Sequence, residues 1–69
     1  MNTFDPQTKE LLLRRMEQRT QQGRAIGVYQ LGDYYTPEQQ IEEARKETPA
    51  GEEFLFAEKK LMDELKKRM

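Results

Sequence analysis

The chain of 69 residues contains no cysteine, no histidine and no tryptophan. Without cysteine it cannot form a disulfide, and without cysteine or histidine it lacks the usual ligands of a zinc site. The commonest general base and the thiol nucleophile of enzymes are missing for the same reason. The sequence also has no phosphate-binding loop, dinucleotide fingerprint or EF-hand spacing. We therefore expect a protein that is not an enzyme and that holds no metal and no cofactor.

An excess of charge of one sign and a long apolar run are also absent. Twelve lysines and arginines oppose 13 aspartates and glutamates, which gives a net charge of −1 at pH 7. General polyanion binders carry a strong basic excess instead. No apolar run approaches the ~20 residues of a membrane span, and the first residues lack the basic and apolar regions of a secretory signal. These features predict a cytoplasmic protein without a membrane segment.

The composition allows only a thin hydrophobic core. Hydrophobic residues make up 35% of the chain and charged residues 36%. A chain of this length buries only about 60% of the surface that its unfolded form exposes. We expect a single domain over residues 1–69 that is stabilised by helix packing and by association with a partner.

Three pairs of a capping residue and a proline indicate where helices begin: Asp5-Pro6, Thr36-Pro37 and Thr48-Pro49. The cap side chain accepts a hydrogen bond from the first turn of the helix, and proline at the next position loses no hydrogen bond there. The predicted fold is all-α, a small three-helix domain with helices at about 6–22, 37–47 and 49–68 and a connector containing glycine and tyrosine at 24–35.

The apolar residues of the first and third predicted helices differ in the width of the face they form. Leu11, Leu12 and Leu13 together span about 200° of the helix circumference, which is wider than one core-facing stripe. One of these leucines is therefore expected to face something other than the core of this chain. The expected core face of the third helix consists of Phe54, Ala57, Leu61 and Leu65, flanked by Leu55 and Met62.

The connector at 24–35 holds all three tyrosines and separates the first two helices. Its segment Val28 to Leu31 has strand character, but one short strand has nothing to pair with in this chain. We expect an ordered connector whose apolar side chains lie across the helices. A short strand that pairs with a partner is the alternative.

Several residues outside the expected core face are of types that often bind other proteins. Phe56 falls about 160° from the expected core face, among charged residues, and a lone aromatic there is typical of a binding hot spot. Met62 has an adaptable side chain, and tyrosines are common at interfaces. Each has a structural alternative, because methionine fills gaps in small cores and aromatic residues cover helix ends. The predicted partner-binding residues are Phe56, Leu11, Tyr34, Tyr35 and Met62.

These observations predict a small non-catalytic module that docks on another protein or regulates it. Self-association as a homodimer through the first and third helices is one form of such binding. The alternative is a small nucleic-acid-associated regulator that uses a basic patch of the first helix, although a solvated charged helix face explains the same residues. That patch consists of Arg14, Arg15, Arg19 and Arg24.

Overall fold

A computed structural model describes residues 4–67 of the chain, which form three helices and one small antiparallel sheet. In chain order the elements are α1 (Pro6–Gln21), β1 (Val28–Gln30), β2 (Asp33–Tyr35), α2 (Pro37–Lys46) and α3 (Pro49–Lys67). The three predicted helices are confirmed to within a residue or two, and residue 68, the predicted end of the third, lies outside the described residues. Among the described residues, no helix is long and apolar enough to cross a membrane.

Each helix begins at the proline that the sequence indicated, because the preceding side chain caps its first turn. Thr36 and Gln39 form a reciprocal pair: the Thr36 hydroxyl accepts from the backbone N–H of Gln39 at 3.2 Å, and the Gln39 side chain accepts from the backbone N–H of Thr36 at 2.9 Å. The Thr48 hydroxyl accepts from the backbone N–H of Gly51 at 3.0 Å. The carboxylate of Asp5 caps α1 in the same way.

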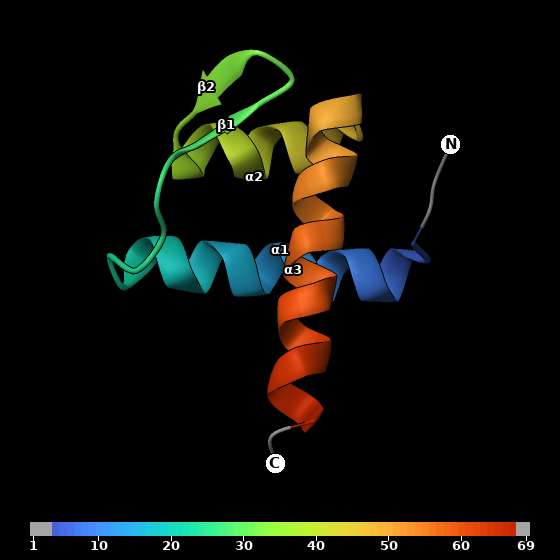
Figure 1. Ribbon diagram of the computed structural model, residues 1–69. Coiled ribbons are helices and arrows are strands. Elements are labelled where there is room, and N and C mark those ends of the chain that lie inside the picture. Colours follow the sequence, from blue (N-terminus) through green and yellow to red (C-terminus); the bar gives the residue numbers. More distant parts are fainter. Residues whose placement is uncertain (1–3, 68–69) are drawn as a thin grey trace.

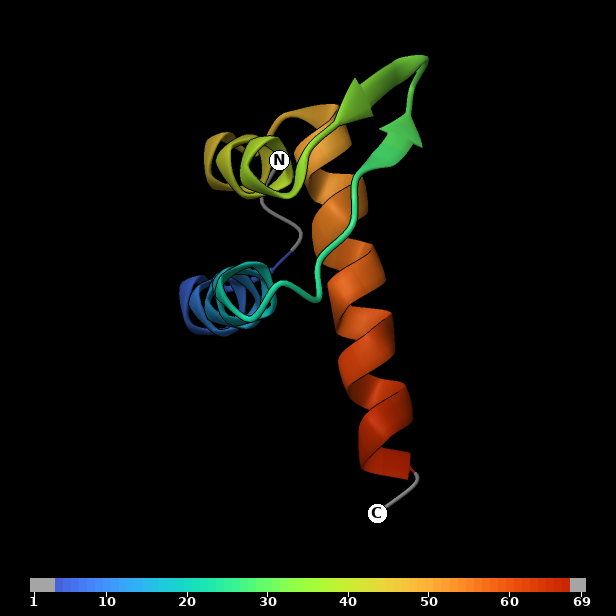
Figure 2. The ribbon, with the colours of Figure 1, turned by 90° about the vertical axis from the view of Figure 1, so that its left-hand side faces the viewer.

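The helices are arranged in two layers. Helices α1 and α2 run antiparallel to each other, and α3 crosses both of them (Figure 1). Seen along α1 and α2, these two helices form one layer, while α3 and the β1–β2 hairpin form the other (Figure 2). The end of α3 extends past the crossing with α1, so its last turns have no helix packed beside them (Figure 1).

The predicted all-α fold is wrong in one element, because the connector contains a β-hairpin. Val28–Gln30 pairs with Asp33–Tyr35 in antiparallel register, so the strand that was expected to lack a partner finds one five residues later in the same chain. The two-residue turn between the strands is formed by Leu31 and Gly32, both with positive φ, at 52° and 84°. Such turns usually carry Asn-Gly or Asp-Gly, and leucine in this place removes the usual sequence signal.

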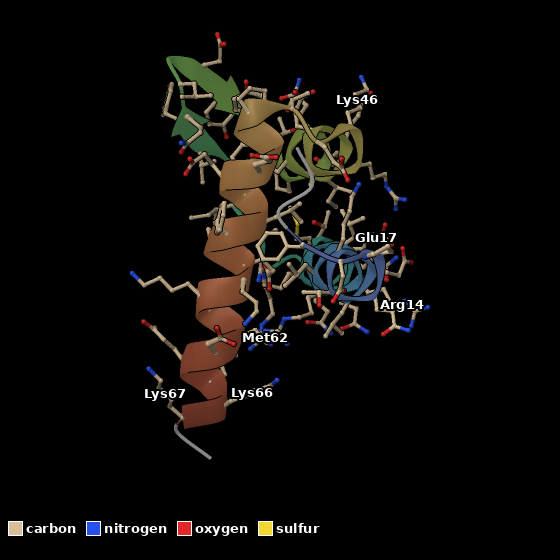
Figure 3. The ribbon with its side chains drawn as sticks, turned by 90° about the vertical axis from the view of Figure 1, so that its right-hand side faces the viewer. Arg14, Glu17, Lys46, Met62, Lys66 and Lys67 are labelled. Carbon is tan, nitrogen blue, oxygen red and sulfur yellow. The ribbon has the colours of Figure 1, made fainter. Side chains whose placement is uncertain are left out.

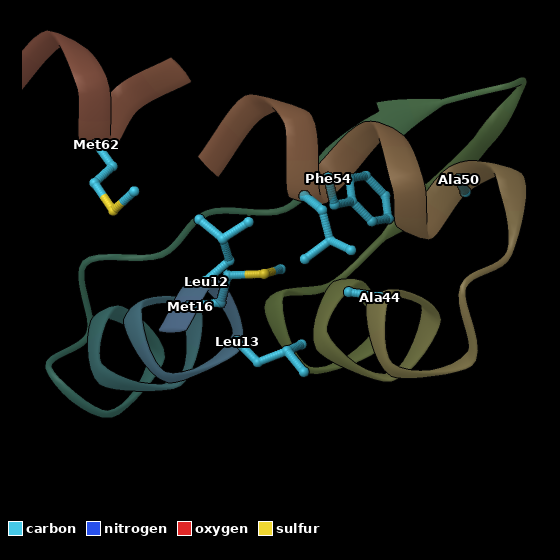
Figure 4. Packing of buried hydrophobic residues seen from close by; sticks show 8 residues of the cluster. Leu12, Leu13, Met16, Ala44, Ala50, Phe54 and Met62 are labelled. Atoms are coloured by element: carbon cyan, nitrogen blue, oxygen red, sulfur yellow. The ribbon is translucent and has the colours of Figure 1, made fainter. Parts of the chain in front are cut away.

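The core lies where α3 crosses α1 and α2 (Figure 4). Tyr35 of the hairpin closes one edge of it, since its ring meets that of Phe54 edge-on with centroids 5.2 Å apart. Of the three consecutive leucines in α1, Leu11 is the exposed one, which confirms that one of them faces away from the core. The buried apolar residues are Leu12, Leu13, Met16, Ala44, Ala50, Phe54, Leu55 and Met62.

Helix α3 is rotated relative to the predicted orientation. Of the four residues expected to form its core face, only Phe54 is buried, while Leu61 and Leu65 are 41% and 44% exposed. Leu55, which was expected to flank the face, is part of the core. The rotation also brings Glu58 into the buried stripe, where the side chains of α1 provide its partners.

Helices α2 and α3 meet at a tight corner. Gly51, in the first turn of α3, packs directly on the backbone of α2: a Cβ atom at this position would lie 2.0 Å from the carbonyl oxygen of Glu43. The Thr48 hydroxyl donates to the Glu43 carboxylate at 2.9 Å and so fixes the same corner. The absence of a side chain at Gly51 therefore sets the distance between the two helices.

Candidate functional site

The residues predicted to bind a partner do not form one surface. Phe56 is partly exposed, and its ring packs against that of Phe4 with centroids 5.2 Å apart. Tyr34 is exposed on the hairpin, where it meets the ring of Tyr29 at 5.0 Å. Leu11 is exposed on α1. These residues lie on three separate elements, α3, the hairpin and α1.

Two of the predicted binding residues belong to the interior or its edge. Met62, a candidate for partner binding, is only 7% exposed and contributes to the core between α3 and α1. Tyr35 is partly buried against Phe54. Both residues have the structural role that was the alternative to binding: Met62 fills the small core, and Tyr35 of the connector covers the helices.

Glu58 is a buried carboxylate that two arginines of α1 neutralise. It is 2% exposed. The Nε atom of Arg15 donates to Oε2 at 3.1 Å, and the Nη2 atom of Arg19 lies 2.5 Å from Oε1. Buried carboxylates are tolerated only when they are paired in this way. The ion pairs hold both guanidinium groups against α3.

Glu58 was not among the predicted site residues, although its spacing in the sequence indicates burial. It lies four residues after Phe54 and four before Met62, which places it on the same helix face as two core residues. An acidic residue within an apolar stripe indicates a buried, paired carboxylate as soon as basic residues are found on a neighbouring helix.

The predicted basic patch is divided among different partners. Arg14 points away from α3 and lies 3.7 Å from Glu10, one turn earlier in the same helix (Figure 3). Arg15 and Arg19 are engaged by Glu58. Arg24 follows the end of α1 and makes no ion pair with any residue in the range 4–67.

A groove of two lobes runs along α3 on the side where the connector passes. Figure 2 shows the backbone of α3 and of the connector from this side. The upper lobe has a volume of about 430 Å³ and lies between α3, the end of α1 and the segment leading into β1. The lower lobe has a volume of about 200 Å³. The two lobes share Arg19, Arg24 and Leu61, and we call them together the α3 groove.

The two lobes differ in chemistry. The upper lobe is mainly apolar, with Phe54 and Met16 in its lining, and contains Glu53 and Glu58 as well as arginines. The lower lobe has no acidic lining residue. It is formed by three arginines, two glutamines and two leucines: Arg15, Arg19, Arg24, Gln18, Gln22, Leu61 and Leu65.

The connector wall of the groove is fastened to α2. The side-chain amide of Gln40 donates to the backbone carbonyls of Ile26 at 2.9 Å and of Tyr35 at 3.3 Å. These bonds hold the entrance to the hairpin beside α3. A groove with this lining can accept apolar side chains and negatively charged groups. Within residues 4–67, no three potential ligand side chains gather closely enough to hold a metal ion.

Comparisons of the chain with protein-family models, with curated proteins and with solved structures found no match. The proposals for its function are therefore based on the geometry of the α3 groove and of the exposed apolar residues around it.

Proposed function

We propose that this chain is a small non-catalytic protein-binding module and that the α3 groove is its docking surface. The observation that carries the proposal is the exposure of Leu61 and Leu65. These leucines lie four residues apart on one face of α3, in a groove with walls, and they remain 41% and 44% exposed. A chain with so few apolar residues gains stability by burying leucines, so a pair left in a groove is typical of a binding site.

The size of the apolar contribution can be estimated. Burying a leucine or isoleucine completely contributes about 1.5–3 kcal/mol. Because Leu61 and Leu65 are less than half exposed and Ile26 of the upper lobe is 75% exposed, covering all three contributes about 2–5 kcal/mol in total. A millimolar complex already needs about 4 kcal/mol. Apolar contact alone therefore gives weak binding, and the polar groups of the groove must contribute the rest.

We place nucleic-acid binding second. Arg15 and Arg19 are turned toward a buried carboxylate, and Arg14 has an acidic neighbour on its own helix. A phosphate backbone requires several cations that are free to approach it together. A homodimer through the α3 groove is the form of the proposal in which the partner is a second copy. A cytoplasmic location remains part of the proposal.

The proposal is tested by selecting peptides whose binding requires the α3 groove. A displayed library of random peptides of about 12 residues, enough for about three helical turns, is selected on the wild-type chain. The counter-selection uses the double variant Leu61→Asn/Leu65→Gln, whose changes lie on exposed positions and leave the core intact. We expect peptides that lose at least about tenfold in affinity on the double variant, which corresponds to about 1.4 kcal/mol.

The matched control is Leu11→Asn, an exposed leucine of α1 outside the groove. It should leave the affinity of the selected peptides unchanged. Light scattering over a concentration series accompanies the selection. If the wild-type chain is a dimer that the double variant dissociates, the partner is a second copy. If no peptide distinguishes the two chains and the wild type is a monomer, the proposal is wrong.

A further inference from the structure

We propose that the segment bound by the α3 groove is acidic, with apolar side chains that contact Leu61 and Leu65 and carboxylates that contact the arginines of the lower lobe. This inference rests on the proposed function of the same groove and names the chemistry of its partner. The occupant is an amphipathic acidic peptide segment of another protein.

The charges of the lower lobe are unbalanced. Three arginines line it, and no aspartate or glutamate does. Glu58, buried behind Arg15 and Arg19, is the one carboxylate within ion-pair distance of them among residues 4–67. Over the two lobes together, three arginines face the two carboxylates of Glu53 and Glu58, which leaves about one positive charge in the groove. A partner that buries this lobe must supply the missing negative charge, because an unpaired buried cation is costly.

The arginines of the lower lobe have more N–H donors than Glu58 engages. Each guanidinium group carries five N–H donors in a planar fork, and a carboxylate can accept two of them in parallel. Glu58 engages the Nε atom of Arg15 and lies beside Nη2 of Arg19. Arg24 is exposed and lines the lower lobe, and within residues 4–67 its side chain makes no ion pair.

The leucines and the arginines lie in one lobe, which determines the pattern of the partner. An apolar side chain that packs on Leu61 and Leu65 places its sequence neighbours beside Arg24 and Arg19. The upper lobe shares Arg19 and Arg24 with the lower lobe and also contains Glu53 and Glu58, so the excess of positive charge lies at the lower lobe. Carboxylates are therefore expected next to the residues that fill the lower lobe. Past this lobe, α3 ends with the exposed Lys66 and Lys67 (Figure 3).

The same combination favours a peptide over a nucleic acid. Nucleic-acid backbones present phosphates at regular intervals and gain affinity from many cations. The lower lobe has three arginines beside two leucines, which is a small number of cations for a phosphate backbone. An acidic side chain on an apolar helix or turn matches this lining, whereas a phosphate backbone leaves the leucines without a contact.

The experiment sequences the peptides that depend on Leu61 and Leu65 and measures their affinities by fluorescence anisotropy. We expect them to carry an excess of aspartate and glutamate over lysine and arginine, beside apolar residues. Arg24→Glu should weaken their binding about tenfold or more, because it reverses a charge at the rim of the site. The control Arg14→Glu makes the same change of charge on α1 outside the groove and should leave the affinity within about twofold.

The outcomes separate this inference from the proposed function. Groove-dependent peptides that are neutral or basic overturn the inference and leave the proposed function standing. A failure to find any groove-dependent peptide overturns both. A short DNA or RNA duplex that binds the wild type, loses affinity on Arg24→Glu and keeps it on Leu61→Asn/Leu65→Gln also overturns the inference, because it assigns the arginines to phosphate.

Discussion

Replacing Gly51 by alanine sets two physical effects against each other. Within a helix, alanine is favoured over glycine by about 1 kcal/mol, because glycine loses more conformational freedom on folding. Gly51 lies in the first turn of α3 and has no positive φ, so the backbone itself accepts alanine. From helix propensity alone, Gly51→Ala should make the protein more stable.

The packing of the corner predicts the opposite sign. The new Cβ atom would lie 2.0 Å from the carbonyl oxygen of Glu43 and 2.7 Å from the backbone nitrogen of Ala44. Both are backbone atoms of α2, which cannot rotate away as a side chain does. An ordinary contact is at least 3.4 Å, so α2 and α3 must separate by about 1 Å or more. This movement also strains the cap between Thr48 and Gly51.

The net effect follows from these magnitudes. Overpacking a core contact costs about 1–3 kcal/mol, and a weakened helix cap adds about 1 kcal/mol. The propensity gain of about 1 kcal/mol offsets part of this, which leaves a destabilisation of about 2 kcal/mol. In a domain of this size, a change of 1 kcal/mol shifts Tm by about 4–8 °C, so Gly51→Ala should lower Tm by about 8–16 °C.

The assay is thermal and urea unfolding followed by far-ultraviolet circular dichroism. The matched control is Gly27→Ala, whose Cβ would lie 1.9 Å from the hydroxyl of Tyr34. That hydroxyl is the far end of an exposed side chain that can turn into solvent, so the control should lose less than about 1 kcal/mol. If Gly51→Ala is as stable as the wild type or more so, α2 and α3 do not pack backbone to backbone at this corner and the reasoning is refuted.

Three further predictions concern the hairpin, the buried carboxylate and the first cap. Leu31→Asn should stabilise the fold by about 1 kcal/mol in the same unfolding assay, because Leu31 is 63% exposed at φ 52° and asparagine tolerates this conformation better. Glu58→Gln should lower the free energy of unfolding by about 1–3 kcal/mol. The double variant Arg15→Met/Arg19→Met should lower it by more, because it leaves the buried charge of Glu58 unpaired. Equal losses for the two variants in urea titrations would contradict this. The hydrogen bond from the backbone N–H of Thr8 lowers the pKa of the Asp5 carboxyl below its usual 3.8, so its contribution to stability is present above that pH and is lost as the pH falls through the lowered value. Asp5→Asn caps without ionising, so the difference in Tm between wild type and variant should shrink as a pH series passes below about 4; a constant difference would show that the charge has no effect.

Local signals explain what could be predicted from the sequence. The three helix starts were predicted correctly because a cap and its proline act within one turn, and the hydrogen bonds of Thr36 and Thr48 realise them. The hairpin was not predicted because its turn is formed by Leu31-Gly32, whereas the usual sequence signal of such a turn is asparagine or aspartate followed by glycine. The strand pair is held by the packing of Tyr35 on Phe54, a contact between residues far apart in the sequence.

The candidate site could be predicted only in part, because it depends on the rotation of α3. The spacing of apolar residues predicted that Phe54, Leu61 and Leu65 lie on the buried face of α3, because a helix face that contains a glutamate is not expected to be buried. The chosen rotation buries Glu58 instead, and only the position of Arg15 and Arg19 on a crossing helix makes this possible. The exposure of Leu11 was predictable because it follows from the width of a single helix face.

The rotation of α3 links the core to the proposed docking surface. Burying Glu58 while leaving Leu61 and Leu65 exposed sacrifices about 1–3 kcal/mol of apolar burial in a chain whose core is thin. Conflicts of this kind between local pattern and fold are concentrated at functional sites. In return, Glu58 holds the guanidinium groups of Arg15 and Arg19 against α3, next to the exposed leucines, in the arrangement that an acidic partner requires. The buried carboxylate therefore positions the charges of the groove, and the same rotation of one helix accounts for both the exposed leucines and the fixed arginines.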